Sequence, residues 1–472
     1  MGSQLLLDPS SLCLHAATKV LKNVELDSSM INESSRLYDI ALQLHTERFP
    51  NYEKHPFTGS ILFGKAELMR SRREFDEAQM LYKRAHTIQM VTLRGDHPQV
   101  AQTLHGIAEN LRMKGNLKES QVFHDRALLI RTNVYGYQKD GTPVHPSIAE
   151  SKNGIASLLY DKGFYFNALV PCEEAIVIRR KTLGTEHYLT AKSEHLMANI
   201  HLSCHEHDKA GPLFEHTIVV NKATFGQRHV QVITAMSDYA LLLKVGGEYD
   251  RAIATFQMVM KIQVQLYGNT HPDIASSLNN IGAVHFAKGD YQEALPYYRQ
   301  SLEMKRACFG NDHSNVASSL HNLAGVYQSL QEYDRARELY DEALSIQTSL
   351  FDYFHPSIAD IMNNLGILMF SKGQHAEAEA SYQRALEIKQ HVYGKDHPAY
   401  ASSLHNLGAL QHAQGRLPEA KASYIQCRDI RLAHLGRNHP DTIACIENLR
   451  ALKLQEIIDI EKMVGDSIEI YQ

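Results

Sequence analysis

The chain has 472 residues, 44% of them hydrophobic, and its 48 basic and 53 acidic side chains give a formal net charge of −5. This weak acidity, without a basic run, argues against nucleic acid as the main partner, because binding phosphates requires clustered Lys and Arg. No run of about 18 apolar residues predicts a membrane span, and the N-terminus lacks the basic start and long apolar core of a secretory signal. The six cysteines are scattered without a CxxC motif, which predicts reduced thiols in the cytoplasm.

Residues 1–54 precede the first regular unit of the sequence. Within this segment, residues 32–49 (NESSRLYDIALQLHTERF) are predicted to form the second helix of a truncated first repeat. The segment contains no sustained heptad pattern, so a long coiled coil is not expected there.

From residue 55 onward, a histidine recurs at intervals of 42 residues, with one interval of 48. The extra residues follow Gly136, where a turn is expected, as is usual for insertions in repeat arrays. Pro follows most of these histidines. Pro is favoured at the first position of a helix, and the residue before it is pushed out of the helical region. We therefore predict that each histidine lies at or beside a helix N-cap and not in a chemical site, since equivalent histidines would form a row spaced about 10 Å apart. The series is His55, His97, His145, His187, His229, His271, His313, His355, His397 and His439.

Three further positions recur at fixed distances from each histidine. The eleventh residue on is Ala or Gly, the eighteenth is usually Gly, and the twenty-seventh is mostly aromatic. One period thus predicts two helices joined by a Gly-marked turn, in which the small residues allow close packing and the aromatic residue fills the space between neighbours. Residues 187–228 are degenerate, with SCHEHDKA where the Gly turn is expected.

The unit SLNNIGAVHFAKGDYQEALPYYRQSLEMK (277–305) resembles the tetratricopeptide repeat, in the 42-residue form of kinesin light chains and nephrocystin-type proteins. The resemblance extends over residues 55–450. It implies an all-α fold, an α-solenoid with a right-handed superhelix of about nine to ten tandem helix-turn-helix repeats. The expected organisation is an N-terminal segment with a truncated first repeat (1–54), nine tandem repeats (55–438), and a C-terminal half repeat with a capping helix (439–472). Kinesin light chains carry a long heptad region before their repeats, and residues 1–54 show none, so association with a kinesin heavy chain stays open.

The C-terminal segment begins like a further repeat but continues as one apolar helix. Its apolar positions are Leu454, Ile457, Ile458 and Met463. Such a helix is predicted to cover the last exposed face of the array, as capping units do. A partner-binding amphipathic helix is the alternative.

The sequence contains no phosphate-binding loop, dinucleotide fingerprint, nucleophile elbow or HExxH motif. One cluster, His201, Cys204, His205 and His207, has the ligand types that zinc prefers. However, His201 occupies an ordinary repeat position and the other three fall in a turn between helices. We therefore predict no metal, no cofactor and no enzymatic activity.

The candidate binding residues are Asn and His side chains on the first helix of each pair, which lines the inner wall in tetratricopeptide arrays. One series stands eight residues after the repeat histidine and the other nine residues after it. An Asn amide both donates and accepts hydrogen bonds, so a row of them suits the backbone of an extended peptide, and the family resemblance implies this role. The alternative is that each Asn bonds to the adjacent repeat and fixes its register. For the ninth-residue series both roles stay open, whereas the less uniform eighth-residue series is favoured for ligand contact. The predicted groove residues are Asn153, Asn279, His321, Asn363 and His405 of the first series and Asn280, Asn322, Asn364 and Asn406 of the second.

Taken together, these features predict a cytoplasmic scaffold or adaptor that binds extended peptide segments of other proteins. The alternative is a cargo adaptor like the kinesin light chains, with kinesin, cytoskeletal or ciliary components as partners and a cytoskeletal association. No nucleic-acid or membrane partner is expected.

Overall fold

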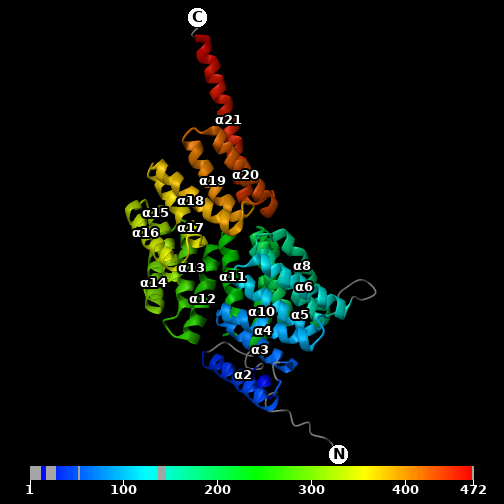
Figure 1. Cartoon of the computed structure of the whole chain (residues 1–472). Coiled ribbons are helices and arrows are strands. Elements are labelled where there is room, and N and C mark those ends of the chain that lie inside the picture. Colours follow the sequence, from blue (N-terminus) through cyan, green and yellow to red (C-terminus); the bar gives the residue numbers. More distant parts are fainter. Residues whose placement is uncertain (1–11, 18–27, 52–53, 137–144, 470–472) are drawn as a thin grey trace, which may run out of the picture. The chain divides into compact units, whose positions relative to one another are not determined.

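The computed structural model describes residues 12–17, 28–51, 54–136 and 145–469. Over these residues the chain forms helices and turns and no strand, as Figure 1 shows. The helices follow one another as antiparallel pairs, and each packs on the next from α2 to α8 and from α10 to α21. The predicted all-α solenoid is therefore confirmed. The insertion at 137–144 lies outside the described residues.

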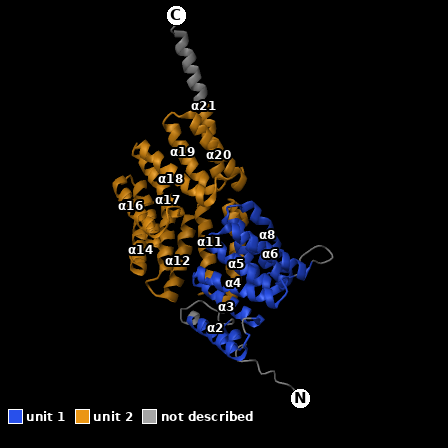
Figure 2. Cartoon of the chain, viewed as in Figure 1, with its two compact units in different colours: residues 1–197 blue, residues 198–472 orange. Residues whose placement is uncertain are grey.

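The chain divides into two compact units, residues 1–197 and 198–472 (Figure 2). The boundary falls inside α9 (Tyr188–Ser203), within the degenerate repeat 187–228. The helices of the first unit are α2 (Ser28–Arg48), α3 (Pro56–Ser71), α4 (Phe75–Thr92), α5 (Pro98–Met113), α6 (Leu117–Tyr135), α7 (Pro146–Asp161) and α8 (Tyr165–Leu183). Those of the second unit are α10 (His207–Phe225), α11 (Val230–Val245), α12 (Tyr249–Tyr267), α13 (Pro272–Lys288), α14 (Tyr291–Phe309), α15 (Ser314–Ser329), α16 (Tyr333–Leu350), α17 (Pro356–Ser371), α18 (His375–Tyr393), α19 (Pro398–Ala413), α20 (Leu417–Leu435) and α21 (Pro440–Glu469). From α3 onward, odd-numbered helices are the first helices of the pairs and even-numbered helices are the second.

The recurring histidine is the N-cap of each first helix, which confirms the prediction. In His397, for example, the backbone is extended and Nδ1 accepts a hydrogen bond from the Ala399 N–H at 3.0 Å. The same contact recurs at all ten positions, from His55 to His439. In six repeats the ring also stacks on an aromatic residue at the end of the preceding helix, as His397 does on Tyr393 with ring centroids 4.6 Å apart. This second contact explains why the position holds His and not the smaller residues that usually cap helices.

The turn between the two helices of a pair requires a left-handed backbone. Gly fills this position in most repeats, and Gly373 has φ of 75°. In three repeats Arg73, His205 and Gln331 take its place and adopt the same positive φ, between 62° and 63°. The degenerate segment SCHEHDKA therefore still forms the regular turn, at the cost of a strained residue.

This strain gives a first testable prediction. Replacing Gln331 by Gly is expected to raise the free energy of unfolding by about 1 kcal/mol, because Gly has no Cβ to clash in the left-handed region. Replacing Gly373 by Gln in the equivalent turn is the matched control and should lower the free energy of unfolding by a similar amount. Chemical denaturation measures both, and a destabilised Gln331→Gly variant would contradict this account of the turn.

The aromatic position twenty-seven residues after each histidine is buried, as predicted. Tyr382 is 1% exposed, and a Cβ added at Gly366, in the small-residue position of the same repeat, would lie 2.5 Å from the Tyr382 ring. The small residue thus provides the space that the ring fills, which links two of the periodic positions to one packing contact.

The helix α21 covers α20 through Leu449 and Leu452, which pack against Tyr424. Leu454, which was predicted to belong to the capping face, is 60% exposed. Two residues along a helix correspond to about 200°, so Leu454 faces away from the side that carries Leu452. The side chains of the other predicted capping residues, Ile457, Ile458 and Met463, lie outside the described part of the structure.

Candidate functional site

The predicted groove residues of the second unit lie side by side on first helices α13, α15, α17 and α19, and all are half-buried. Three contacts between repeats join them: Asn322 Nδ2 donates to Asn279 Oδ1 at 2.8 Å, Asn364 Nδ2 lies 2.9 Å from His321 Nε2, and Asn406 Nδ2 donates to Asn363 Oδ1 at 3.1 Å. Each joins the ninth-residue Asn of one repeat to the eighth residue of the repeat before it. We call these six residues the ladder.

The ladder connects neighbouring repeats and also keeps hydrogen-bonding capacity. An Asn amide has two donors and an acceptor with two lone pairs. The contact of Asn322 with Asn279 uses one of the two donors of Asn322. The side chains are half-buried, so each keeps some exposure to solvent. The contacts show a role in joining repeats, while peptide binding by the ladder stays a prediction.

The remaining predicted groove residues also lie on first helices. Asn153 on α7 accepts a hydrogen bond from Ser193 Oγ at 2.8 Å, again between adjacent repeats. His405 on α19 lies edge-on to Tyr424, with ring centroids 5.6 Å apart. Asn280 lies on α13 and is half-buried.

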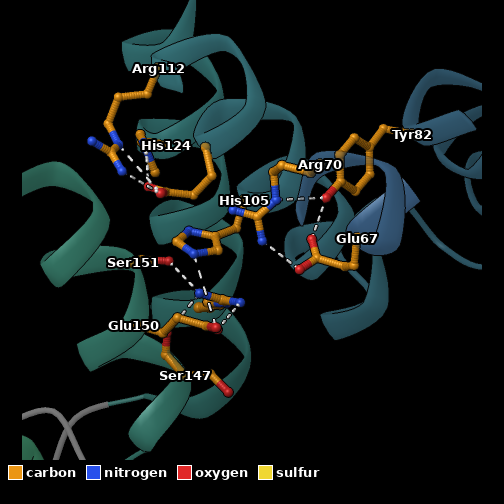
Figure 3. A network of polar contacts seen from close by, with 11 residues as sticks. Glu67, Arg70, Tyr82, His105, Arg112, His124, Ser147, Glu150 and Ser151 are labelled. Atoms are coloured by element: carbon orange, nitrogen blue, oxygen red, sulfur yellow. Dashed lines mark hydrogen bonds and ion pairs between the residues drawn. The ribbon is translucent and has the colours of Figure 1, made fainter. Parts of the chain in front are cut away.

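In the first unit, the first helices carry charged side chains in place of the ladder (Figure 3). On α3, Glu67 pairs with Arg70 at 2.5 Å and also accepts a hydrogen bond from the Tyr82 hydroxyl. Burial, together with the charge of Glu67, raises the pKa of Tyr82 above its ordinary value. The Tyr82 hydroxyl therefore stays protonated and donates to the carboxylate.

The next first helix carries Glu109, which contacts an arginine and a buried histidine. Its carboxylate lies 3.0 Å from Arg112 and 3.3 Å from the buried His124 ring (Figure 3). Although burial by itself acts to raise the pKa of Glu109, the contact with His124 and the charge of Arg112 hold that pKa well below its ordinary value. Glu109 is therefore an anion over the physiological pH range.

On α7, Glu150 pairs with Arg131 at 2.7 Å, and His105 from α5 lies 4.0 Å away. Arg131 also donates to Ser151 Oγ at 2.8 Å, so its guanidinium joins α6 to α7 (Figure 3). Burial lowers the pKa of His105 to about 4, despite the nearby carboxylates. His105 is thus neutral at neutral pH, and the charged groups at this position are Glu150 and Arg131, which neutralise each other.

Lys192 on α9 interacts electrostatically with groups on three other first helices of this unit, namely Glu109 on α5, Glu150 on α7 and Arg70 on α3. Burial has the largest effect on the pKa of Lys192 and lowers it. Attraction by Glu109 opposes this shift, and repulsion by Arg179 and Arg70 adds to it. Even so, the Glu150 side chain is 47% exposed. We call Glu67, Arg70, His105, Glu109, Glu150 and Lys192 the charged wall, a surface where groups from four repeats lie close together and still reach solvent.

The second helices of the first unit expose apolar side chains. They come from two repeating positions on α4, α6 and α8, namely Met80, Val122, Leu129, Val170 and Val177. In the C-terminal repeats one of these positions carries charged or polar residues, such as Glu303 and Glu387. This second-helix row is the competing candidate for a partner surface.

The sequence-predicted metal-like cluster does not come together as a ligand set. His201 Nδ1 contacts Glu206 at 2.6 Å, while His205 and His207 face each other with ring centroids 4.3 Å apart. Within the described residues, the His and Cys side chains that lie close enough to share an ion are His405, Cys427 and Cys445. Sequence reasoning missed this group because its members are scattered along the chain.

None of the helices in the described ranges has an apolar stretch long enough to cross a bilayer.

The repeated helix pairs, with their fixed cap, turn and aromatic positions, define a tandem-repeat solenoid. A tetratricopeptide repeat model matches residues 57–133, 231–307, 315–391 and 357–433, and a second tetratricopeptide repeat model matches residues 148–188. The chain belongs to the tetratricopeptide repeat family, as predicted. Arrays of this kind are scaffolds for protein interactions, so the partners of this chain are proteins.

One solved structure supports the fold, and two others are similar over part of the chain. The chain is similar to the apo form of RapI, with a TM-score of 0.51 and 14% identity over 79% of this chain and 97% of that chain. It is also similar to a Podosopora anserina protein described as a kinesin light chain with nearly identical repeats, at 24% identity, a TM-score of 0.39, and coverage of 43% of this chain and 97% of that chain. BtubC (BKLC) from P. vanneervenii shares 23% identity, with a TM-score of 0.38 and coverage of 53% and 94%. The comparison with curated proteins gives no significant match.

Proposed function

We propose that this protein is an adaptor that binds extended segments of partner proteins along its first helices. The observation that carries the proposal is the charged wall, where side chains from α3, α5, α7 and α9 converge and yet stay accessible. Such a surface presents fixed charges to a bound chain over several consecutive repeats, which gives specificity and faster association.

The second unit supports the same role with different chemistry. Its ladder offers amide and imidazole groups, which suit a peptide backbone more than charged side chains. This unit also curves back on itself, because the His205 ring in the α9–α10 turn lies 5.5 Å from the ring of His439, the N-cap of α21. A strongly curved stack of repeats favours an enclosed path for an extended segment.

The finer alternative is a cargo adaptor of the kinesin-light-chain type in the cytoplasm, associated with the cytoskeleton. This alternative rests on the 42-residue form of the repeat, which resembles that of kinesin light chains. Co-sedimentation of the protein with microtubules in the presence and absence of kinesin heavy chain distinguishes the two proposals. We propose no catalytic role.

A charge reversal on the wall tests the proposal. Lys192→Glu is expected to weaken binding of partners recovered by affinity purification by about tenfold, since reversing one charge in a complementary interface costs about 1–2 kcal/mol. The loss should grow as salt is lowered. Lys261→Glu, the same change on the exposed face of second helix α12, is the matched control and should bind normally.

A variant of the second-helix row tests the competing binding surface. A Val122→Ser, Val170→Ser variant is expected to retain the partners. If it loses them while Lys192→Glu keeps them, binding takes place on the second helices and the proposal is wrong.

A further inference from the structure

Two buried cysteines meet at the last interface between repeats. Cys427 on α20 and Cys445 on α21 are each 0% exposed, and their Sγ atoms lie 2.8 Å apart. This separation is shorter than a contact between two unbonded sulfurs bridged by a metal, for which tetrahedral Zn–S bonds of about 2.3 Å give about 3.8 Å.

The repeat pattern shows that packing alone does not require sulfur at either position. Cys427 stands thirty residues after its repeat histidine, and Cys445 stands six residues after the next one. The preceding repeats place small or β-branched residues in the first position: Ala85, Ala127, Ala175, Thr217, Val259, Ser301, Ala343 and Ala385. In the second position they place Thr103, Ser151, Ser193, Ala235, Ser277, Ser319, Ile361 and Ser403. Cysteine occurs in both positions at one interface alone.

The surroundings of Cys445 favour a thiolate. Arg431 donates to Cys445 Sγ at 3.2 Å and to the Asp441 carbonyl at 2.8 Å. Arg131 and Arg179 make the same pair of contacts at two interfaces of the first unit, each to a serine Oγ (Ser151 and Ser193) and to a backbone carbonyl. At the last interface the equivalent arginine faces a sulfur in place of a hydroxyl. The hydrogen bond from Cys427, with the contact of His405 and the charge of Arg431, lowers the pKa of Cys445 below its ordinary value although burial opposes this.

We propose that Cys427 and Cys445 form a reversible disulfide that covalently joins α20 to α21. With a peroxide as oxidant, the Cys445 thiolate attacks one peroxide oxygen, the O–O bond breaks, and hydroxide leaves from a cysteine sulfenic acid. The Cys427 thiol then attacks the Cys445 sulfur, the S–O bond breaks, and water leaves as the S–S bond forms. Two thiols and one peroxide thus give one disulfide and two waters, and a thiol reductant reverses the reaction.

The proposed disulfide lies next to one of the predicted groove residues. Cys445 Sγ lies 3.6 Å from His405 Nδ1, and His405 is one of the predicted groove residues on α19. Oxidation therefore changes the partner of a side chain at the C-terminal end of that surface. His405 also completes a set of three groups within 4.8 Å of one another, so a bound metal is the competing outcome. The guanidinium of Arg431 beside Cys445 opposes a cation there.

The test is oxidation of the purified full chain with hydrogen peroxide, followed by thiol counting, intact mass and peptide mapping. We expect the loss of two of the six thiols, a mass decrease of two hydrogen atoms, a mapped 427–445 crosslink, and full reversal by dithiothreitol. The oxidised protein should also unfold at a higher temperature than the reduced one, because the bond closes a loop of the unfolded chain.

The control variants restore the residues that other repeats use, so they should fold. Cys427→Ala and Cys445→Ser are each expected to abolish both the crosslink and the oxidation-dependent shift in unfolding temperature. The proposal is overturned if the half-exposed Cys13 and Cys308 are oxidised while residues 427 and 445 remain thiols. It is also overturned if the protein takes up stoichiometric zinc that protects both thiols until a chelator removes it.

Discussion

We expect a triple variant of the ladder, Asn279→Ala, His321→Ala and Asn363→Ala, to bind its partner segment on the order of 30-fold more weakly than the wild type. These three residues are the ladder members that stand eight residues after the repeat histidine. Each side chain should contribute about 0.5–1.5 kcal/mol of hydrogen bonding to a bound backbone, and 1.4 kcal/mol corresponds to a tenfold change in affinity. Isothermal titration with the wild type and the variant measures the difference.

The ladder supplies its own control. A second variant, Asn322→Ala, Asn364→Ala and Asn406→Ala, breaks the same three contacts between repeats from the other side. The two variants should therefore lose similar stability, although Asn363 also accepts a bond from Ser403. A larger loss of affinity in the first variant assigns ligand contact to the eighth-residue series. Equal stability losses with unchanged affinity in both would assign the ladder to repeat register alone.

Lowering the pH from 7 to about 4 is expected to destabilise the protein by several kcal/mol, because folding lowers the pKa of four capping histidines, His145, His355, His397 and His439. Nδ1 accepts a backbone N–H, and protonation removes that acceptor. Burial, with the neighbouring charges of His434 and Lys389, lowers the pKa of His397 to about 4 from its ordinary value of 6.5. Burial lowers the pKa of His145, His355 and His439 as well.

The sign follows from these directions. A histidine whose pKa falls on folding contributes stability above pH 6.5, and this contribution is lost as the pH drops through the lower folded-state pKa. For His397 the loss is about 1–2 kcal/mol after allowance for solvent screening.

The variant His397→Ser isolates one cap. Ser accepts the same backbone N–H but does not titrate, so this variant should lose less stability between pH 6.5 and 4 than the wild type. His412→Gln, at a position that caps no helix, should leave the acid profile unchanged. Identical profiles for wild type and His397→Ser would contradict the capping account.

The repeat period predicted the fold because each periodic position performs one local task. The capping histidines, the turn residue and the buried Tyr382 could all be assigned from spacing, since cap, turn and packing requirements recur in every repeat. Even the turns at Arg73 and Gln331 keep the regular backbone although Gly is absent.

The sites were harder to predict because function uses positions where the repeats differ. The charged wall includes side chains such as Glu150 and Lys192, which are not repeated and come together only through the stacking of repeats. Cys427 and Cys445 are separated by a helix end and a turn, so no sequence motif links them. Their proximity could have been predicted only by aligning adjacent repeats and comparing the residues at these two positions. Leu454 was misassigned because apolar character alone does not say which side of a helix is covered.

The most direct test of the central claim is photo-crosslinking from the first helices. A photoreactive residue is placed in turn at positions 279, 321 and 363, and the crosslinked positions on the bound partner are mapped by mass spectrometry. First helices of successive repeats lie about 10 Å apart and an extended chain advances about 3.3 Å per residue, so the crosslinks should shift by about three partner residues per repeat. Probes at Glu303 and Glu387 on the second helices should give no such series. Crosslinks from the second-helix positions, with none from the first helices, would contradict the claim that partners bind along the first helices.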